Sequence, residues 1–355
     1  MPNEIPSKTA VKKAGETLRI AAPNSQEYSA ALDVLSSWRG LFADPLNAFN
    51  VLLRKMCKKI GVTDKAIVAR RLKRTPSIVA KLRRFRDMDL CRMQDIGGLR
   101  VIVPSIEDVY KIHRLLENSR MKHEIVKPCH DYIKNPKKDG YRSLHQVCRY
   151  RSETKLELSK LNLLVEVQIR TQVQHAWATA VEALGVIEKS SFKTGEGEQD
   201  FRRFFVLSSA LLSILEDQPI VEELKGVPPI KIVEEFEALQ ERFHIFLKLQ
   251  GVVSVKKVNT KDAAFYIMVL DAENRTLKLW GFASSEAEDA EKFYKFLEID
   301  NRSKETVEVV LVSVDSLKKV QRAYPNYFLD CNDFIKQITE VCQKIKSQNQ
   351  QTPNA

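Results

Sequence analysis

The chain has 355 residues, of which 44% are hydrophobic and 29% are charged, and its formal net charge at pH 7 is +11. This composition is ordinary for a soluble globular protein, and the length is sufficient for two domains with separate cores. No stretch approaches the roughly 20 apolar residues of a membrane span, and the N-terminus lacks the apolar run of a secretory signal. We therefore expect a cytoplasmic protein with no membrane partner. The six scattered cysteines argue against a disulfide framework or a zinc site.

The positive charge belongs to the first half of the chain. Residues 1–190 carry 35 Lys and Arg against 20 Asp and Glu, whereas residues 191–355 carry 22 against 26. Eight of these cations and no acid lie between Arg70 and Arg86, where Thr75 and Pro76 are typical of a helix cap and first turn. A polyphosphate or a nucleic acid is the natural partner of such a region, although a solvated surface explains an unlocalised excess equally well.

In chain order, residues 1–25 lack periodicity and are predicted to be a flexible N-terminus. Residues 26–60 have apolar residues at helical spacing, interrupted at Asp44-Pro45, which predicts two helices. A short β-branched strand follows Asp95, a helix is predicted over 106–118, and residues 130–145 form a turn-like loop. Strands are predicted over 146–150 and 162–170, followed by a helix over 172–188 that Thr171 can cap.

The rest of the chain predicts a second unit. Residues 190–199 are typical of a linker, and a disordered tail is expected over 348–355. Between them, helices are predicted over 201–215, 230–249, 287–297 and 332–346, and strands over 252–258, 264–270, 276–282 and 308–314. The expected organisation is therefore a flexible start (1–25), a first domain (26–190), an α+β domain of unknown role (191–347) and a tail (348–355).

Two carboxylates are the strongest candidates for chemistry. Asp95 leads directly into the first strand, and Glu166 lies within the strand that ends at Thr171. Alternation along that strand places Val165, Val167 and Ile169 on one face and Glu166, Gln168 and Arg170 on the other. If the two strands are neighbours, Asp95 and Glu166 can hold one Mg²⁺ between them. His175 and Glu182, two helical turns apart, are more typical of structural residues than of a metal site.

Three ordered motifs then resemble one family. Asp95-Ile-Gly-Gly-Leu-Arg100, Asp131-Tyr-Ile-Lys-Asn-Pro-Lys137-Lys-Asp-Gly-Tyr141-Arg-Ser-Leu-His145 and Glu166-Val-Gln-Ile-Arg170-Thr are similar to the RelA/SpoT-type alarmone synthetase domain, over roughly residues 45–190. The resemblance implies an α+β fold with a nucleotidyltransferase-like mixed β-sheet flanked by helices, followed here by a separate smaller α+β domain. It also implies a GTP pyrophosphokinase, which transfers pyrophosphate from ATP to the 3′-hydroxyl of GDP or GTP and makes (p)ppGpp.

The resemblance also assigns roles to residues. It implies that Asp95 and Glu166 are catalytic and bind Mg²⁺, and that Glu166 orients or deprotonates the 3′-hydroxyl. It places the ATP adenine between Arg71 and Arg100, and the ATP phosphates on Lys73, Lys81 and Arg84. The acceptor guanine is expected to stack on Tyr141, with His145, Gln168 and Lys137 on the same side.

Two departures from the family pattern concern the acceptor. Here His130 precedes the Asp-Tyr-Ile motif where lysine is common, and Asp139 precedes Gly140 where Asn is common. Some toxic small members of the family pyrophosphorylate the 3′ end of tRNA instead of a free nucleotide, so tRNA stays an alternative acceptor. An inactive nucleotide- or RNA-binding module is a second alternative, which the retained carboxylates disfavour. No alarmone hydrolase domain is expected, and a homo-oligomer or a regulatory partner bound through the C-terminal domain stays open.

Overall fold

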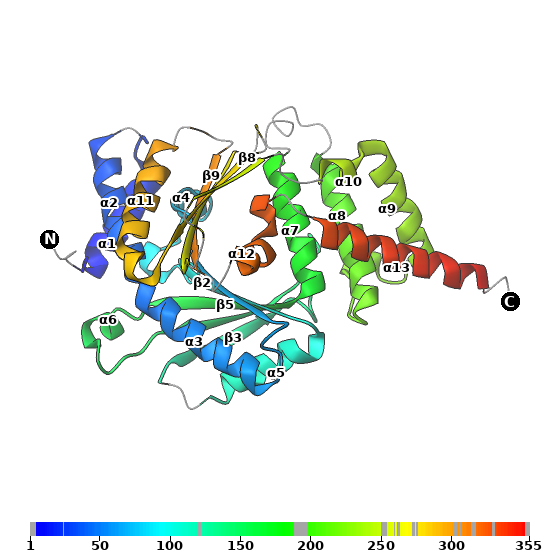
Figure 1. The fold of residues 1–355 in the computed structure, drawn as a ribbon, viewed down its shortest axis with the longest axis horizontal. Coiled ribbons are helices and arrows are strands. Elements are labelled where there is room, and N and C mark those ends of the chain that lie inside the picture. Colours follow the sequence, from blue (N-terminus) through cyan, green and yellow to red (C-terminus); the bar gives the residue numbers. More distant parts are fainter. Residues whose placement is uncertain are drawn as a thin grey trace.

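The structure is a computed structural model that describes residues 5–23, 25–119, 122–187, 198–249, 254–258, 260, 263–271, 274, 276–301, 304, 307–313, 317–328 and 331–351. The helices are α1 (Lys8–Ile20), α2 (Gln26–Gly40), α3 (Ala43–Lys59), α4 (Thr75–Arg84), α5 (Ile106–Glu117), α6 (Leu156–Lys160), α7 (Gln172–Ile187), α8 (Glu198–Leu215), α9 (Pro229–Phe243), α10 (Ile245–Lys248), α11 (Ala287–Asp300), α12 (Leu317–Ala323) and α13 (Asn332–Gln351). The strands are β1 (Ile67–Leu72), β2 (Gly97–Val103), β3 (Glu124–Asp131), β4 (Leu144–Arg149), β5 (Leu164–Thr171), β6 (Ser254–Val258), β7 (Phe265–Asp271), β8 (Thr276–Phe282) and β9 (Val307–Ser313). Figure 1 shows the sheet between α1, α2 and α11 on one side and α8, α9, α10 and α13 on the other.

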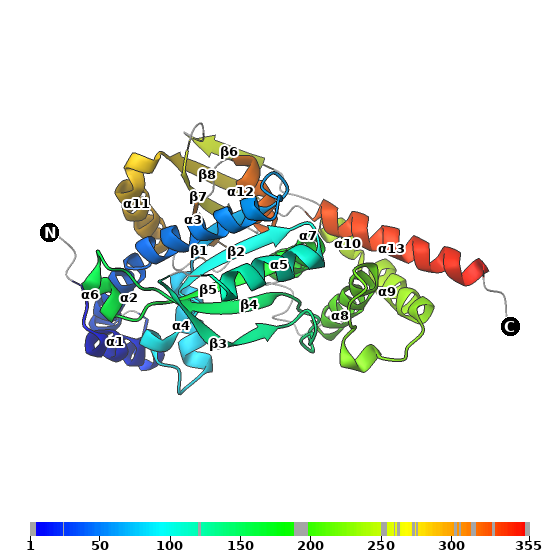
Figure 2. The same cartoon turned by 90° about the horizontal axis from the view of Figure 1, so that it is seen from below.

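The strands form one mixed sheet in the order β3-β4-β5-β2-β1-β9-β7-β8-β6. Figure 2 shows β3 and β6 at its opposite edges. The pairs β2–β5 and β6–β8 are parallel, and the other neighbouring pairs are antiparallel. This arrangement confirms the predicted α+β class with a large mixed sheet flanked by helices.

Each face of the sheet has its own core because successive side chains of a strand point to opposite faces. Within β1, Ile67 and Ala69 belong to a core that includes α7, α8, α9 and α13, whereas Val68 belongs to a core that includes α1 to α5. The predicted alternation in β5 is confirmed, since Val165, Val167 and Ile169 are fully buried. Glu166 and Gln168 consequently point to the opposite face.

The predicted separation of a C-terminal domain needs a correction. Strands β6 to β9 continue the sheet of the first region, because β9 pairs with β1 through Arg70–Ser313 and Arg71–Val312. The two regions therefore share one sheet, and the boundary set at residue 190 stays a prediction. Most of the linker predicted over 190–199 lies outside the described residues.

Parts of two segments that were predicted to be flexible are helical. α1 begins after Ser7, whose Oγ accepts a hydrogen bond from Ala10 N at 3.2 Å, and it buries Val11, Ala14 and Leu18. Those residues are three and four apart, which is the spacing of one helical face and a signal that the prediction of a flexible start missed. At the other end, α13 continues to Gln351, beyond the expected start of a disordered tail at 348.

Other differences are local. The helix predicted over 230–249 is divided into α9 and α10 because His244 has a positive φ of 49°, outside the helical region. β1, β3, α6 and α12 were not predicted. Thr75 is the first residue of α4 instead of its cap, and its backbone N donates to Glu298 Oε1 at 3.2 Å. All six cysteines are free thiols.

Glu298 on α11 joins the C-terminal part of the chain to α2 and α4. Its carboxylate forms a 3.0 Å ion pair with Arg39, which is buried, and accepts a 2.6 Å hydrogen bond from Tyr294 Oη. We expect Glu298→Ala to lower the free energy of unfolding by about 3 kcal/mol, because it leaves a buried guanidinium without its carboxylate. Urea unfolding measures this difference.

The matched control is Glu288→Ala on the same helix. Glu288 is exposed and lies 3.8 Å from Lys292, so its removal is expected to change the free energy of unfolding by less than about 0.5 kcal/mol. Equal unfolding curves for the two variants would contradict the role given to Glu298.

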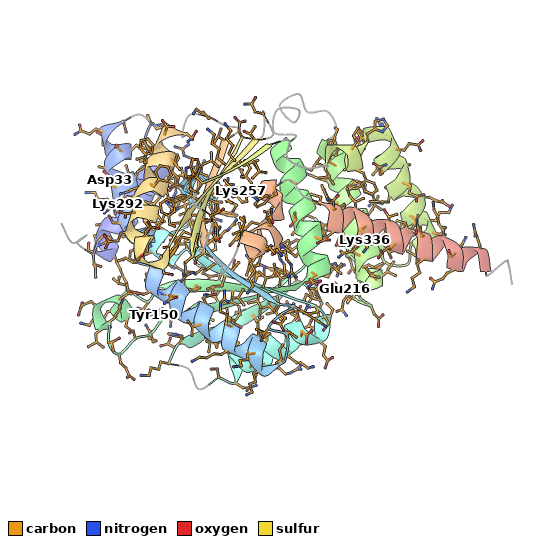
Figure 3. All side chains as sticks on the ribbon, viewed as in Figure 1. Asp33, Tyr150, Glu216, Lys257, Lys292 and Lys336 are labelled. Carbon is orange, nitrogen blue, oxygen red and sulfur yellow. The ribbon has the colours of Figure 1, made fainter. Side chains whose placement is uncertain are left out.

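Helices α8 and α7 meet where side chains of both are buried. Gln174 Nε2 donates to Glu216 Oε2 at 3.0 Å, and Figure 3 labels Glu216 beside the lower end of α8.

Among the described residues, no helix combines the length and apolar content that a membrane crossing requires. The cytoplasmic location stays a prediction.

Candidate functional site

Asp95 and Glu166 come together as the sequence predicts. β2 and β5 are parallel neighbours, with Gly98 opposite Glu166, and Asp95 lies in the turn that leads into β2. Both carboxylates line one cavity of about 90 Å³ on the sheet face opposite the Val165 core. The negative charge of Asp95 also acts to raise the pKa of Glu166, so the two groups interact electrostatically.

Asp95 is held by two of the predicted phosphate-binding lysines. Lys73 Nζ lies 3.0 Å from Oδ2 of Asp95, and Lys81 Nζ lies 3.0 Å from Oδ1. Burial acts to raise the pKa of Asp95, but the two ammonium groups outweigh it and lower the pKa below the ordinary value. The carboxylate is therefore ionised at neutral pH and can exchange these cations for a metal ion.

Glu166 ends a chain of hydrogen bonds. Its Oε1 lies 3.0 Å from His145 Nδ1, and its Oε2 accepts from Gln168 Nε2 at 2.7 Å. Burial acts to raise the pKa of Glu166, but His145 and Gln168 lower it below the ordinary value, so this carboxylate is also ionised. Because an ionised carboxylate only accepts, His145 Nδ1 is the donor, and Nε2 accepts from Tyr141 Oη at 2.8 Å.

The predicted acceptor residues surround this chain. We define the acceptor loop as residues 132–143, between β3 and β4. Lys137 Nζ lies 4.4 Å from the ring centroid of Tyr132 and 5.1 Å from that of Tyr141. A base that stacks on Tyr141 would therefore share or replace this cation–π contact.

Arg71 and Arg100 line the same cavity, and so does Tyr324, a residue of the C-terminal part of the chain that was not predicted to be there. The guanidinium of Arg100 lies 5.6 Å from the ring centroid of Tyr324, which is 1% exposed and also lines the cavity. Burial acts to lower the pKa of Arg71, whereas Glu182, Tyr327 and Tyr324 raise it above the ordinary value. Tyr324 thus lies against Arg100, one of the two arginines between which the resemblance places adenine.

The segment that carries Tyr324 is held by backbone contacts. Arg100 Nη1 donates to Ala323 O at 3.0 Å, and His175 Nε2 donates to Arg322 O at 2.8 Å. His175 Nδ1 in turn accepts from Arg170 Nη2 at 2.7 Å. These bonds fix α12 and the following turn against the site, and they confirm the structural interpretation of His175.

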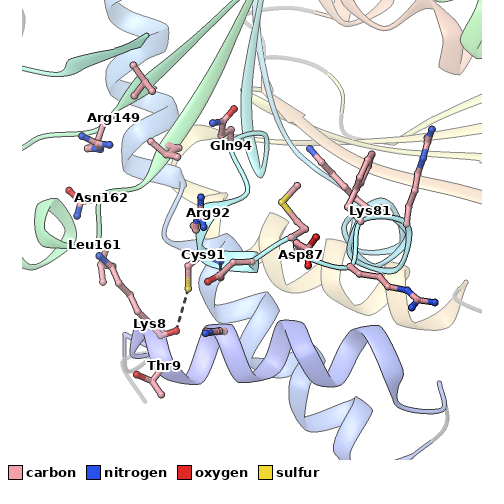
Figure 4. Close-up of a pocket in the computed structure, with 18 residues that line it drawn as sticks. Lys8, Thr9, Lys81, Asp87, Cys91, Arg92, Gln94, Arg149, Leu161 and Asn162 are labelled. Carbon is pink, nitrogen blue, oxygen red and sulfur yellow. Dashed lines mark hydrogen bonds between the residues drawn. The ribbon is translucent and has the colours of Figure 1, made fainter. Parts of the chain in front are cut away.

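A second and larger opening adjoins the first. Lys81 and Arg84 line a groove of about 1410 Å³ that extends from α4 to α1 and to the ends of β4 and β5. Figure 4 shows Lys81 on one side of this groove and Arg149 and Asn162 on the other. Its lining contains two acids, Asp87 and Asp89, and seven cations: Lys8, Lys12, Lys81, Arg84, Arg86, Arg92 and Arg149.

The donor set fits magnesium better than zinc. Among the described residues, no three His, Cys, Asp or Glu side chains converge as a metal cluster. Mg²⁺ is commonly bound by one or two carboxylates together with substrate phosphates and water. Two ionised carboxylates on one cavity, beside lysines that can bind phosphate, meet that requirement.

The structure brings together the predicted residues in three groups. Arg71, Lys73, Arg100 and Gln168 share the small cavity with the two carboxylates. His145, Tyr141 and Lys137 extend from Glu166 into the acceptor loop. Lys81 and Arg84 line the groove instead of the small cavity, and the guanidinium of Arg84 lies 5.3 Å from the Phe85 ring centroid.

Part of the chain is similar in sequence to known proteins. Residues 70–195 match the family model described as the region found in RelA / SpoT proteins. GTP pyrophosphokinase YjbM of Bacillus subtilis (strain 168) is 35% identical over 119 residues, which cover 33% of this chain and 54% of that protein. A GTP pyrophosphokinase of Haemophilus influenzae is 32% identical over 154 residues, which cover 42% of this chain and 18% of that protein.

Among solved structures, small alarmone synthetase 1 from Bacillus subtilis bound to its product pppGpp is 27% identical. That likeness covers 51% of this chain and 92% of the solved chain, with a TM-score of 0.40. The chain thus spans about half the length of YjbM and less than a fifth of the Haemophilus influenzae protein.

Proposed function

We propose, because residues 70–195 belong to the RelA/SpoT family, that the chain is a pyrophosphokinase that transfers the β,γ-pyrophosphate of ATP to the 3′-hydroxyl of GDP or GTP. The observation that carries the proposal is the convergence of Asp95 and Glu166 on one cavity, with Lys73 and Arg100 in its lining. Pyrophosphoryl transfer needs this combination of carboxylates and cations, because negative charge develops on several oxygens in the transition state.

The residues have distinct parts in this reaction. The 3′-oxygen attacks the β-phosphorus, the bond from that phosphorus to the α-phosphate oxygen breaks, and AMP leaves. Glu166 orients the 3′-hydroxyl and accepts its proton, while His145 and Gln168 hold the carboxylate in place. Lys73 and Lys81 form ion pairs with Asp95 in this structure, and they would bind phosphate oxygens instead when ATP is present.

Asp95 and Glu166 are the residues that would hold Mg²⁺. The ion would neutralise phosphate oxygens and stabilise the charge that develops on transfer. Both carboxylates have a pKa below the ordinary value, so neither must lose a proton before it binds a cation at neutral pH.

The test is to incubate the full chain with γ-³²P-ATP and Mg²⁺ and to supply GDP, GTP or tRNA separately. Label on GDP or GTP is the expected result. Label on tRNA alone would support the second candidate below. Absence of transfer to all three acceptors, in the wild type and in Tyr324→Ala, would contradict the proposal and favour an inactive binding module.

The groove favours tRNA as a second candidate acceptor. Five of its seven cations are not among the residues expected to bind ATP: Lys8, Lys12, Arg86, Arg92 and Arg149. A duplex or a single strand of RNA carries phosphates at regular spacing and suits an extended basic surface. This candidate keeps the same transfer chemistry and changes only the molecule that presents the hydroxyl.

Removal of two exposed groove cations separates the acceptors. We expect the double variant Arg86→Ala, Arg92→Ala to transfer label to tRNA more weakly. The slope of the logarithm of tRNA affinity against the logarithm of salt concentration should become shallower by about 2, one for each lost phosphate contact. Transfer to GDP or GTP should not change, because neither arginine lines the small cavity.

Initial rates at several salt concentrations measure both effects. Lys231→Ala, on the distant helix α9, is the control for a lost surface cation. If the double variant behaves like this control with tRNA, the groove does not bind the acceptor.

A further inference from the structure

Helix α8 lies outside the region that matches the family model and packs directly on the acceptor loop. Ser209 Oγ donates to Gly140 O at 2.6 Å and accepts from Arg142 Nε at 3.0 Å. We infer that Ser209 is a positioning residue that fixes the acceptor loop, so that the C-terminal part of the chain sets how the acceptor binds. The identity of the acceptor rests on the proposed function, whereas the role of Ser209 in holding the loop rests on geometry.

The contact uses the donor and one acceptor lone pair of a single hydroxyl. Ser209 is 1% exposed and Arg142 is 4% exposed, so water does not substitute for either partner. A hydroxyl offers one donor and can also accept, and here the donor meets a carbonyl while an oxygen lone pair meets a guanidinium. Alanine at 209 would leave both Gly140 O and Arg142 Nε without this partner.

The backbone of the loop is shaped to fit α8. Gly140 has a φ of +88°, which L side chains rarely adopt. A Cβ atom at that position would lie 2.8 Å from Ser209 Cβ and 3.1 Å from Trp177 Cζ2. Trp177 Nε1 also donates to Phe205 O at 2.9 Å, so α7, α8 and the loop form one packed unit.

Tyr141 and His145 link the Ser209 contact to the carboxylate of Glu166. Tyr141 is between Gly140 and Arg142, and its Oη donates to His145, which donates to Glu166. A change in the position of residues 140–142 therefore moves the predicted stacking ring and its hydrogen bond. The two lysines that pair with Asp95 lie directly after β1 (Lys73) and on α4 (Lys81), so the effect should be selective for the acceptor.

Ser209→Ala tests the inference against Ser213→Ala. Ser213 is a buried serine on the same helix whose Oγ donates to Ala210 O at 2.7 Å, within its own helix. We expect Ser209→Ala to raise the KM for the acceptor about tenfold while the KM for ATP changes less than about twofold. Ser213→Ala should leave both values near those of the wild type.

Hydrogen–deuterium exchange of the full chain supplies a readout that needs no turnover. Amides of residues 137–145 should exchange faster in Ser209→Ala than in the wild type or in Ser213→Ala. Unchanged exchange together with unchanged KM values would overturn the inference, as would an equal rise in both KM values. An inactive wild type would instead overturn the proposed function, while the exchange data would still decide whether Ser209 fixes the loop.

Discussion

Glu166→Gln is expected to reduce pyrophosphate transfer by about 10²- to 10⁴-fold, the usual contribution of a positioned general base. Glutamine keeps the size of the side chain and an oxygen that His145 Nδ1 can donate to, but it lacks the negative charge. The variant therefore loses the proton acceptor and one proposed metal ligand with little change in packing. Initial rates of label transfer from γ-³²P-ATP measure the loss.

Glu157→Gln is the matched control for Glu166→Gln. Glu157 is an exposed residue of α6, and its carboxylate pairs with Lys160 at 2.7 Å, so it takes no part in the site. Thermal unfolding of both variants would show that the fold is intact. Transfer by Glu166→Gln at the rate of the control would remove Glu166 from the catalytic residues.

Tyr324→Ala is expected to increase the affinity for ATP. The cavity of about 90 Å³ is smaller than the roughly 300–1,000 Å³ of common ligand sites, and Tyr324 lies over Arg100 within it. We therefore expect adenine to stack on Arg100 only after the Tyr324 ring moves away from the guanidinium. On this hypothesis, the structure has the predicted adenine site in a closed form.

The size of the effect follows from the loss of a buried aromatic ring. Truncation of a buried aromatic residue to alanine typically lowers stability by about 3 kcal/mol, and here the loss would destabilise the closed conformation. That energy corresponds to a factor of about 100 in the equilibrium between closed and open forms. We therefore expect up to about 100-fold tighter binding of a non-hydrolysable ATP analogue, measured by isothermal titration calorimetry.

Tyr324→Phe is the control that separates the ring from the hydroxyl. It keeps the contact with Arg100 and loses only the 3.3 Å hydrogen bond from Tyr324 Oη to Arg70 O. The phenylalanine variant should bind the analogue nearly as weakly as the wild type. An alanine variant that is folded and binds no tighter would show that Tyr324 does not close the site.

Much of the site could be predicted from the sequence because its signals are local. Alternation in β5 places Glu166 opposite a buried row of valine and isoleucine, and the pairing of β2 with β5 confirms that the two strands are neighbours. The strand that carries Arg71 was missed because Ile67–Leu72 contains adjacent arginines, which obscure the apolar pattern of a buried strand. The roles of Arg71, Lys81 and the other site residues stay predictions.

The contribution of the C-terminal part could not be predicted in the same way. Arg100 contacts the backbone of Ala323, which is 223 positions away in sequence, and no periodicity in α12 indicates such a contact. Ser209 is likewise 69 positions from Gly140. Both contacts depend on the shared sheet and on the packing of α7 and α8, which join regions that composition and charge divide.

The transfer of both terminal phosphates of ATP tests the central proposal most directly. ATP labelled at the β-phosphate and ATP labelled at the γ-phosphate are each supplied with Mg²⁺ and the acceptor, to wild type and to Tyr324→Ala. We expect either label to reach the acceptor and one AMP to form for each transfer. Transfer of the γ-label alone, with ADP as the product, would contradict the proposed pyrophosphate transfer.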